Sequence, residues 1–220
     1  TSSIWINEIH YDNASTDSNE GVEVAGPAGT DLGSYYLLAY NGGNGAYYAS
    51  NAISGTIDDE GCGYGALWFA MAGLQNGPSD AVALVHSGQV VQFLSYEGVM
   101  TATNGPAAGM TAVDLGVMET GNETNMSLQL RGTGSSYAQF VWAGPTNDMS
   151  MGALNAGQFI TACSGDLDGD GLPDTWESAY FSGATNATSD ADPDNDGFNN
   201  YAEYVAGTIP TNGLSFFAIE

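Results

Sequence analysis

The chain has 220 residues, in which 26 acidic side chains stand against one basic side chain, Arg131, so the formal net charge is −25. One cation cannot neutralise a run of phosphates, which excludes direct electrostatic binding of DNA, RNA or an anionic membrane surface and nearly excludes a nucleotide pocket built on Lys or Arg. Hydrophobic residues make up 43% of the chain, enough for a real core, so a disordered acidic tail is excluded as well.

The charge also predicts where the protein works. Bound divalent cations or a saline medium would offset it, and both indicate an extracellular setting. No apolar run reaches the roughly 18 residues of a membrane span, so we expect no membrane insertion. Residues 1–5 have no initiator Met and no basic region, which is typical of a mature terminus after signal cleavage or of a trimmed one. We therefore expect a secreted protein from a marine or saline habitat.

Residues 4 to about 160 are predicted to be all β. Short apolar runs alternate with turn residues, and no stretch shows the 3.6-residue apolar period of a helix. The runs 81–85 and 90–94 flank His86-Ser87-Gly88-Gln89, a sequence that predicts a hairpin. About seven to nine strands over this length predict a β-sandwich. The other predicted strands are residues 4–6, 22–24, 35–40, 66–69, 127–130 and 140–142.

Five segments of this region resemble a known family. They are INEIHYD at 6–12, EGVEVAG at 20–26, DLGSY at 31–35, GTIDDEG at 55–61 and QFLSYEG at 92–98. In this order they resemble the secreted bacterial lamin-tail domain, over roughly residues 4–160. The resemblance implies an immunoglobulin-like β-sandwich that is not itself catalytic, of the kind attached to secreted nucleases, phosphatases or surface proteins.

The two cysteines, Cys62 and Cys163, do not form a C-x-x-C pair. An even number of cysteines in a secreted chain favours a disulfide between them, and two buried free thiols are the alternative. Cys62 departs from the lamin-tail pattern, in which this loop usually carries a polar residue. A cross-link to Cys163 would therefore be a local addition to the family fold.

Two acidic stretches of twelve residues follow Ser164. Residues 166–177 carry carboxylates at positions 1, 3, 5, 9 and 12 and glycine at position 6, and residues 192–203 repeat the spacing with Asn at position 9. This is the spacing of a calcium loop, in which hard oxygens surround the ion at about 2.4 Å and position 7 offers its backbone carbonyl. Plain acidic turns are the alternative, which two complete copies disfavour. The predicted ligands are Asp166, Asp168, Asp170, Leu172, Asp174 and Glu177 in the first loop and Asp192, Asp194, Asp196, Phe198, Asn200 and Glu203 in the second.

These loops resemble bacterial relatives of thrombospondin type 3 and dockerin repeats. No helix enters the first loop, because residues 159–162 are predicted to form a strand, and Pro173 lacks the N–H that paired EF-hands exchange at position 8. Each loop is followed by a predicted short helix with an apolar face. Trp176 and Tyr180 form this face on the first helix, and Tyr201 and Val205 form it on the second. We expect these faces to pack on each other or on the sandwich, and the calcium ions to be permanent structural supports.

Two further acidic clusters are candidates for a third cation, with a solvated surface as the alternative. The residues are Glu8, Asp12, Asp17, Glu20 and Glu23 in one cluster and Asp58, Asp59 and Glu60 in the other.

Catalysis is not expected. His10 and His86 are isolated from any metalloprotease, serine-hydrolase or cysteine–histidine motif, and His86 is predicted to lie on the surface at a turn. Acidic pairs are too abundant to specify a glycosidase. Trp5, Trp68 and Trp142 are predicted to be buried, whereas tyrosines are candidates for an exposed contact surface. Those tyrosines are Tyr35, Tyr36, Tyr40, Tyr47 and Tyr48.

Three parts are therefore expected: a lamin-tail-like sandwich over 1–163, two calcium loops with short helices over 164–210, and an apolar tail over 211–220. The leading hypothesis is a non-enzymatic, calcium-binding structural or adhesive protein of the bacterial surface. Such a protein could join copies of itself into a filament by strand addition through residues 214–220. The alternative is an accessory module of a larger secreted hydrolase that binds glycans or other cell-surface material.

Overall fold

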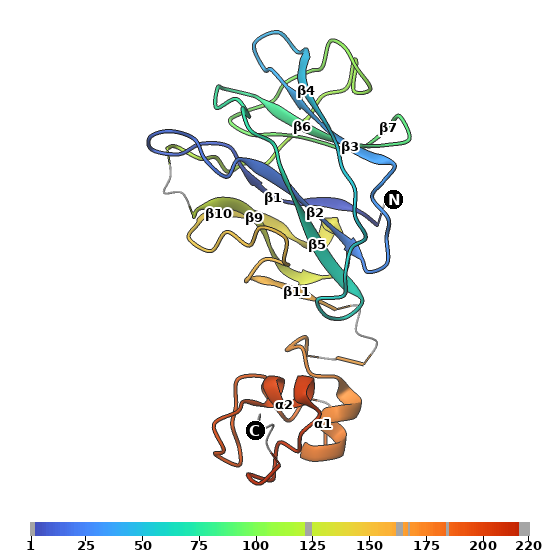
Figure 1. Ribbon diagram of the computed structural model, residues 1–220, viewed down its shortest axis with the longest axis vertical. Helices are drawn as coiled ribbons and strands as arrows, with labels where there is room; N and C mark the ends of the chain where they lie inside the picture. The colour runs from blue at the N-terminus through green and yellow to red at the C-terminus, as the bar shows by residue number, and fades with distance from the viewer. Residues whose placement is uncertain (1–2, 122–124, 162–164, 167, 184, 216–220) are drawn as a thin grey trace. The chain divides into compact units, whose positions relative to one another are not determined.

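The structure is a computed structural model and describes residues 3–121, 125–161, 165–166, 168–183 and 185–215 (Figure 1). The chain divides into two compact units. The first comprises residues 1–132 and 136–158, and the second comprises residues 133–135 and 159–220. Within the described ranges, no helix combines the length and the apolar character that crossing a bilayer requires.

The first unit is mainly β and contains two sheets. One sheet has the order β10-β9-β1-β2-β5, with β11 also pairing with β9, and the other has the order β4-β3-β6-β7-β8. Neighbouring strands are antiparallel along the second sheet except for the parallel pair β7 and β8. The strands of the first sheet are β1 Trp5–His10, β2 Gly21–Pro27, β5 Tyr64–Ala70, β9 Ser127–Gly134, β10 Val141–Thr146 and β11 Gln158–Ile160. Those of the second are β3 Tyr35–Tyr40, β4 Tyr47–Ala52, β6 Ala81–His86, β7 Gln89–Ser95 and β8 Val113–Asp114.

Apolar side chains from both sheets share one core. Val22 and Val24 alternate with polar neighbours on β2, so one face of that strand is apolar, and Leu37 and Leu84 supply the facing side from the second sheet. Two antiparallel sheets around a shared core are consistent with the predicted β-sandwich.

Strands β3 and β6 of the second sheet are buried on both faces, because a loop over residues 100–112 covers the outer side there. Leu38, Ala83 and Phe93 pack there against Met100 and Ala107 of the loop. Burial on both faces removes the need for polar alternation, and the apolar run 81–85 is what such a strand requires.

All eight predicted runs overlap observed strands, and the predicted hairpin joins β6 to β7. Ser87 and Gly88 at its tip have φ of 49° and 80°, the left-handed geometry that a two-residue turn needs. Strands β4 and β8 were not predicted, since β4 is an exposed edge strand with little apolar alternation and β8 has two residues. His86 is half-buried and stacks on Tyr35, with ring centroids 4.2 Å apart, whereas the sequence predicted a surface residue.

Cys62 is disulfide-bonded. Cys163, its predicted partner and the only other cysteine in the sequence, lies outside the described residues.

The second unit contains two helices, α1 Asp174–Phe181 and α2 Asn200–Ala206. They contact each other through Trp176, whose ring lies 5.9 Å from that of Tyr204. Tyr204 therefore makes the contact that the sequence assigned to the face of Tyr201 and Val205, and Val205 is 67% exposed. The tail follows α2, and Leu214 is 87% exposed. Residues 216–220, which the strand-addition hypothesis needs, lie outside the described residues.

A buried histidine–glutamate pair ties β1 to a residue 109 positions further along the chain. His10 Nδ1 lies 2.9 Å from Glu119 Oε1, and both side chains are fully buried. Glu119 Oε2 also accepts hydrogen bonds from the backbone N–H groups of Tyr11, at 2.7 Å, and Asp12, at 2.8 Å. Burial alone would lower the pKa of His10, but the hydrogen bond and the negative charge of Glu119 outweigh it and raise the pKa.

We therefore predict that Glu119→Ala destabilises the first unit by about 3–5 kcal/mol, because it leaves a buried imidazole and two N–H groups without their partner. Urea unfolding followed by tryptophan fluorescence measures the change. Met118→Ala is the matched control, because Met118 is 48% exposed, and it should change the free energy of unfolding by less than about 0.5 kcal/mol. Equal losses in the two variants would contradict the role assigned to the pair.

Candidate metal centres

The first acidic loop curls around its own carboxylates. Asp166 accepts hydrogen bonds from the N–H groups of Gly169, at 2.8 Å, and Gly171, at 3.0 Å. Gly171 has φ of 91°, which a residue with a side chain adopts only with strain. As a result, one carboxylate oxygen from each of Asp166, Asp168 and Asp170 lies within 4.8 Å of the others.

The second loop repeats this arrangement. Asp192 accepts a hydrogen bond from Gly197 at 3.0 Å, and Gly197 has φ of 96°. Asp194 and Asp196 complete a triplet whose oxygens again lie within 4.8 Å of one another. Both loops therefore use the N–H of the glycine at position 6 to hold the aspartate at position 1, as their shared spacing predicts.

A buried glutamate from the following helix lies at position 12 of each loop. Glu177 is 0% exposed and Glu203 is 1% exposed. One oxygen of each has a partner, since Ala187 N–H donates to Glu177 at 3.0 Å and the Thr208 hydroxyl donates to Glu203 at 3.2 Å. The other oxygen of each is buried without a hydrogen-bond partner. Burial, and then the negative charges of the loop aspartates, raise the pKa of both glutamates.

Unpartnered oxygens are most numerous in the second loop. Five of its six predicted ligand residues have a buried side-chain oxygen with no hydrogen-bond partner among the described residues. These oxygens are Oδ1 of Asp192, Oδ2 of Asp194, Oδ2 of Asp196, Oδ1 of Asn200 and Oε2 of Glu203. Each such oxygen costs free energy unless a hydrogen-bond donor or a cation approaches it.

The donor set decides which cation would fit. All the side-chain ligands are carboxylate or amide oxygens, which hard cations such as Ca²⁺ prefer, and neither triplet contains a histidine or cysteine. The two triplets are therefore compatible with Ca²⁺. In the first loop Asp174 is half-buried at the start of α1, and it lies outside the triplet. Leu172 is fully buried, whereas Phe198, at the same position of the second loop, is exposed.

The predicted third acidic cluster does not come together at one point. Glu8 and Glu23 bond to residues 150 and 152, whereas Asp12 accepts from Asn76, Asp17 from the N–H of Asn13 and Glu20 from that of Gly73. In the other candidate cluster, Asp59 accepts from two turn N–H groups and Glu60 accepts from Ala66 and Leu154. Only the two aspartate triplets bring metal-ligating groups together among the described residues.

Glu8 and Glu23 instead hold a segment against the outer face of the first sheet. They are opposite each other on β1 and β2 and are both fully buried. Ser150 N–H lies 3.2 Å from the Glu8 carboxylate, Gly152 N–H donates to Glu23 at 2.6 Å, and Leu154 N–H donates to Glu60 at 2.6 Å. Alternate N–H groups of residues 150–154 are thus each received by a glutamate, which fixes this segment in place.

The single hydroxyl hydrogen of Ser150 faces three acceptors. The Ser150 hydroxyl contacts Glu8 Oε2 and lies 3.0 Å from Asn155 Oδ1 and 3.5 Å from Glu23 Oε2. Burial, and then the charge of Glu8, raise the pKa of Glu23 to about 8, against hydrogen bonds from Asn7 and Gly152 that lower it. The negative charge of Glu60 raises the pKa of Glu23 further. Burial and the neighbouring negative charge thus both favour the protonated form of Glu23.

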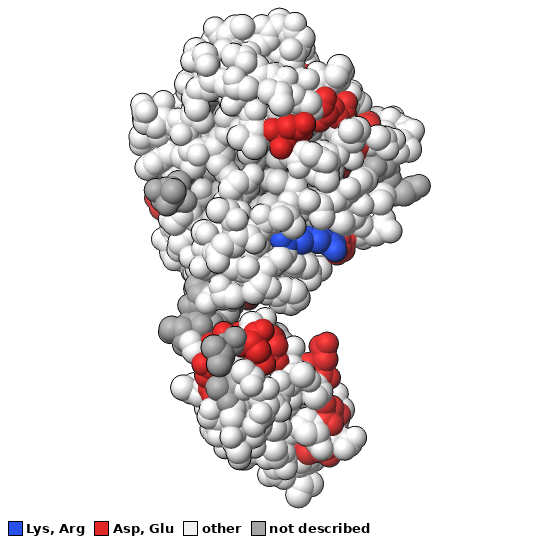
Figure 2. Space-filling model, turned by 180° about the vertical axis from the view of Figure 1, so that it is seen from behind, with Lys and Arg blue, Asp and Glu red and all other residues white. Residues whose placement is uncertain are grey.

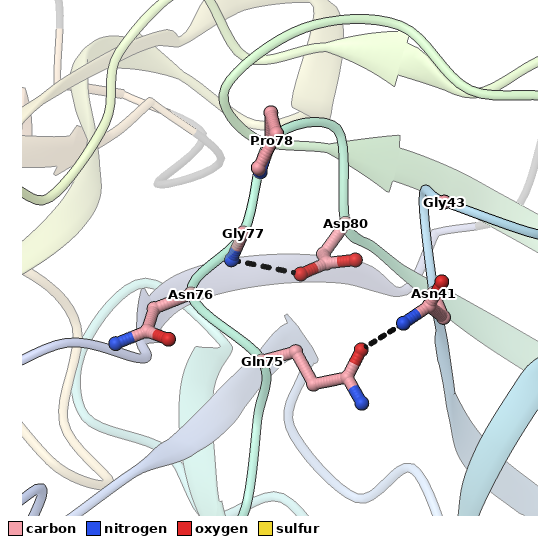
Figure 3. A pocket seen from close by; sticks show the side chains of 7 residues that line it. All are labelled: Asn41, Gly43, Gln75, Asn76, Gly77, Pro78 and Asp80. Atoms are coloured by element: carbon pink, nitrogen blue, oxygen red, sulfur yellow. Dashed lines mark hydrogen bonds between the residues drawn. The ribbon is translucent and has the colours of Figure 1, made fainter.

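A polar pocket of about 380 Å³ opens in the first unit beside β3 and β6 (Figure 3). Asp80 holds its wall, because it accepts hydrogen bonds from Gly42 at 2.7 Å and Gly77 at 3.0 Å. Asn41 donates a hydrogen bond to Gln75 across the pocket, and Asn76 turns away to bond Asp12. The sequence did not single out these residues, because they are scattered over forty positions and form no motif.

The only basic residue, Arg131, pairs with Asp148, with Nη2 at 2.9 Å from Oδ2 and both side chains partly exposed. Figure 2 shows the one basic side chain on the first unit and patches of acidic side chains on parts of the visible face of the second. Charge in the second unit is thus not offset by basic side chains.

No family model matches the chain, and comparison with curated proteins and with solved structures gave no match either. The resemblances to the lamin-tail domain and to thrombospondin type 3 and dockerin repeats therefore stay predictions.

We predict that the first unit loses stability as the pH rises from about 5 to about 9. The unfolded chain releases the Glu23 proton near 4.5 and the folded chain near 8, so the folded state binds more protons in between and its advantage is lost as pH rises. Glu8→Gln removes the neighbouring charge and can donate to Ser150, so it should stabilise the protein at pH 9 by about 1–3 kcal/mol and flatten the pH dependence.

Thermal unfolding across this pH range, in saturating calcium, measures the effect. Asp114→Asn, an exposed acid far from this network in the sequence, is the control and should keep the wild-type slope. An unchanged pH dependence of stability in Glu8→Gln would show that the charge of Glu8 does not raise the pKa of Glu23.

Proposed function

We propose that this is a non-enzymatic, extracellular calcium-binding protein whose second unit is held in its fold by two Ca²⁺ ions. The observation that carries the proposal is the set of five buried, unpartnered oxygens at the predicted ligand positions of residues 192–203. Glu203 and Asn200 are each 1% exposed, so bulk solvent does not reach their free oxygens. A cation bound by Asp192, Asp194 and Asp196, whose ligand oxygens lie within 4.8 Å of one another, would supply the missing partner for oxygens of this set.

Calcium would support the fold rather than perform chemistry. Bound to each loop, it would offset two of the four negative charges on three aspartates and on the buried glutamate within the adjoining helix, and so fix α1 and α2 to their loops. Two ions would change the net charge from −25 to −21, that is −25 plus 4. In a saline, calcium-rich medium, bound calcium and the screening of the remaining negative charge by salt both favour the folded unit.

For the first unit we propose an immunoglobulin-like sandwich of the lamin-tail type with a structural or adhesive role on a bacterial surface. Support comes from the order of the five matching segments and from two sheets around a shared core. Self-association through residues 214–220 remains a hypothesis that rests on the apolar sequence of this tail.

The calcium proposal predicts two bound ions per chain by isothermal titration calorimetry. Glu203→Gln should remove one of the two binding events, because the neutral amide offers only one oxygen where two close the site. Asp190→Asn is the matched control, since Asp190 is an exposed acid two positions before the second loop and should leave both events. Protein that takes up no Ca²⁺ at millimolar concentration would end the proposal.

Chelation provides a second readout of the same prediction. Hydrogen exchange with EGTA present should lose protection in residues 165–215, while β1, β2 and β6 keep theirs. Equal protection of the helices with and without calcium would be the opposite result.

A second candidate function is a glycan-binding module, which the polar pocket favours. Two carboxamides and one carboxylate around a small pocket offer donors and acceptors of the kind that bind sugar hydroxyls. Outside the pocket lining, the Tyr48 hydroxyl accepts a hydrogen bond from the backbone N–H of Gln75 at 2.8 Å.

Glycan-array binding tests this candidate. We expect Gln75→Ala to lower binding of neutral glycans at least tenfold, because it removes a carboxamide from the pocket wall. Asn51→Ala, which removes a half-buried carboxamide of β4 outside the pocket, is the control and should leave binding unchanged. Wild-type protein that binds no glycan on the array would remove this candidate.

A further inference from the structure

The two acidic loops are joined by a short linking segment, residues 187–191, that hydrogen-bonds to both. On the side of the first loop, two of its N–H groups meet ligand carboxylates. Ala187 donates to Glu177 Oε1 at 3.0 Å, and Ser189 donates to Asp170 Oδ2 at 2.7 Å. The first loop therefore receives two of its carboxylate contacts from residues that lie outside it.

On the side of the second loop, three carbonyl groups of the same segment meet the start of α2. Ala191 accepts from Asn200 N–H at 2.7 Å, and Ser189 accepts from Tyr201 N–H at 3.0 Å. Thr188 accepts from the Asn200 side-chain amide at 2.8 Å. The amide nitrogen of Asn200 is thus bound to Thr188. The amide oxygen, Oδ1, has no hydrogen-bond partner and is one of the five unpartnered oxygens of the second loop.

The linking segment thus contacts ligand residues of both loops. In the first loop these are Asp170 and Glu177, and Glu177 keeps Oε2 free; in the second it is Asn200, which keeps Oδ1 free. A second connection is the close approach of the Tyr201 ring of α2 to the backbone of Gly171 in the first loop. A Cβ atom added to Gly171 would lie 3.5 Å from this ring.

We propose that the linking segment couples the two calcium sites, so that filling either loop increases the affinity of the other. The coupling rests on the proposed calcium binding. An ion in the first loop fixes Glu177 and Asp170, which holds Ala187 and Ser189 and therefore the carbonyl groups that orient Asn200. The entropic cost of ordering five backbone residues is then met by the first ion and not again by the second. By linkage the effect is the same in both directions.

Calcium titrations of the full chain measure the coupling. Glu203→Gln leaves the first loop as the working site, and Glu177→Gln leaves the second. The overall two-ion binding constant of the wild type, divided by the product of the two single-site constants, is the coupling factor. We expect a factor of roughly 5–150, and a factor of 1 would overturn the proposal. A wild type without calcium binding would instead remove the proposed function, and the coupling with it.

An insertion separates the linking segment from the loops themselves. Two glycines added after the exposed Asp190 would move the acceptor at Ala191 away from the donors at Ala187 and Ser189 while leaving every ligand in place. We expect both sites to bind calcium with a coupling factor near 1. The same insertion after Asn212, in the turn beyond α2, is the control and should keep the wild-type factor. Full coupling in the first insertion variant would contradict the role of residues 187–191.

Single-site variants that bind no calcium need one more measurement. Far-UV circular dichroism should show the first unit folded, and hydrogen exchange of Ala187 and Ser189 in Glu203→Gln should lose protection at calcium concentrations that protect them in the wild type. Full protection of both amides in this variant would mean that the first loop does not depend on the second, and the coupling would be refuted.

Discussion

The scarcity of positive charge governs how this protein buries its acids. With Arg131 as the only basic residue, a buried carboxylate must find a backbone N–H, a hydroxyl, a histidine or a metal ion. The first unit uses the first three kinds of partner. Glu119 pairs with His10 and two N–H groups, and Glu8, Glu23 and Glu60 receive the N–H groups of one segment. In the second unit, buried carboxylate oxygens of Glu177, Asp192, Asp194, Asp196 and Glu203 have no hydrogen-bond donor among the described residues, and all belong to predicted ligand positions.

Much of the fold could be predicted because it depends on local patterns. Alternating apolar residues mark β2, and the left-handed pair Ser87 and Gly88 marks the hairpin. The candidate calcium ligands were also accessible from spacing, since a twelve-residue loop imposes its own geometry. The glycine at position 6 must take a positive φ, and it does so in both loops. Edge strand β4 escaped prediction because its side chains face solvent and carry little periodic signal.

The acid pairs of the first unit could not have been predicted from the sequence in the same way. Glu119 lies 109 residues from His10, and Ser150 lies 142 residues from Glu8. Nothing in the local sequence of either partner marks the contact, because the sheet topology alone brings β1 beside the later segments. The sequence grouped Glu8 with Asp12, Asp17, Glu20 and Glu23 because they are near in the chain. In space Glu8 and Glu23 come together against residues 150 and 152, whereas Asp12, Asp17 and Glu20 contact other segments.

Arg131 has a consequence for handling this protein. Trypsin-like enzymes cut after lysine or arginine, so the whole chain offers them one bond, between Arg131 and Gly132. That bond lies inside β9, where Arg131 pairs with Val141 of β10 and Gly132 N–H donates to Gly157 at 2.8 Å. A protease needs this stretch extended and free in its cleft, so digestion must wait until β9 leaves the sheet. The rate of cleavage at this bond would thus report how often β9 separates from the sheet. Proteases of this specificity in the surroundings would have one site at which to cut the chain.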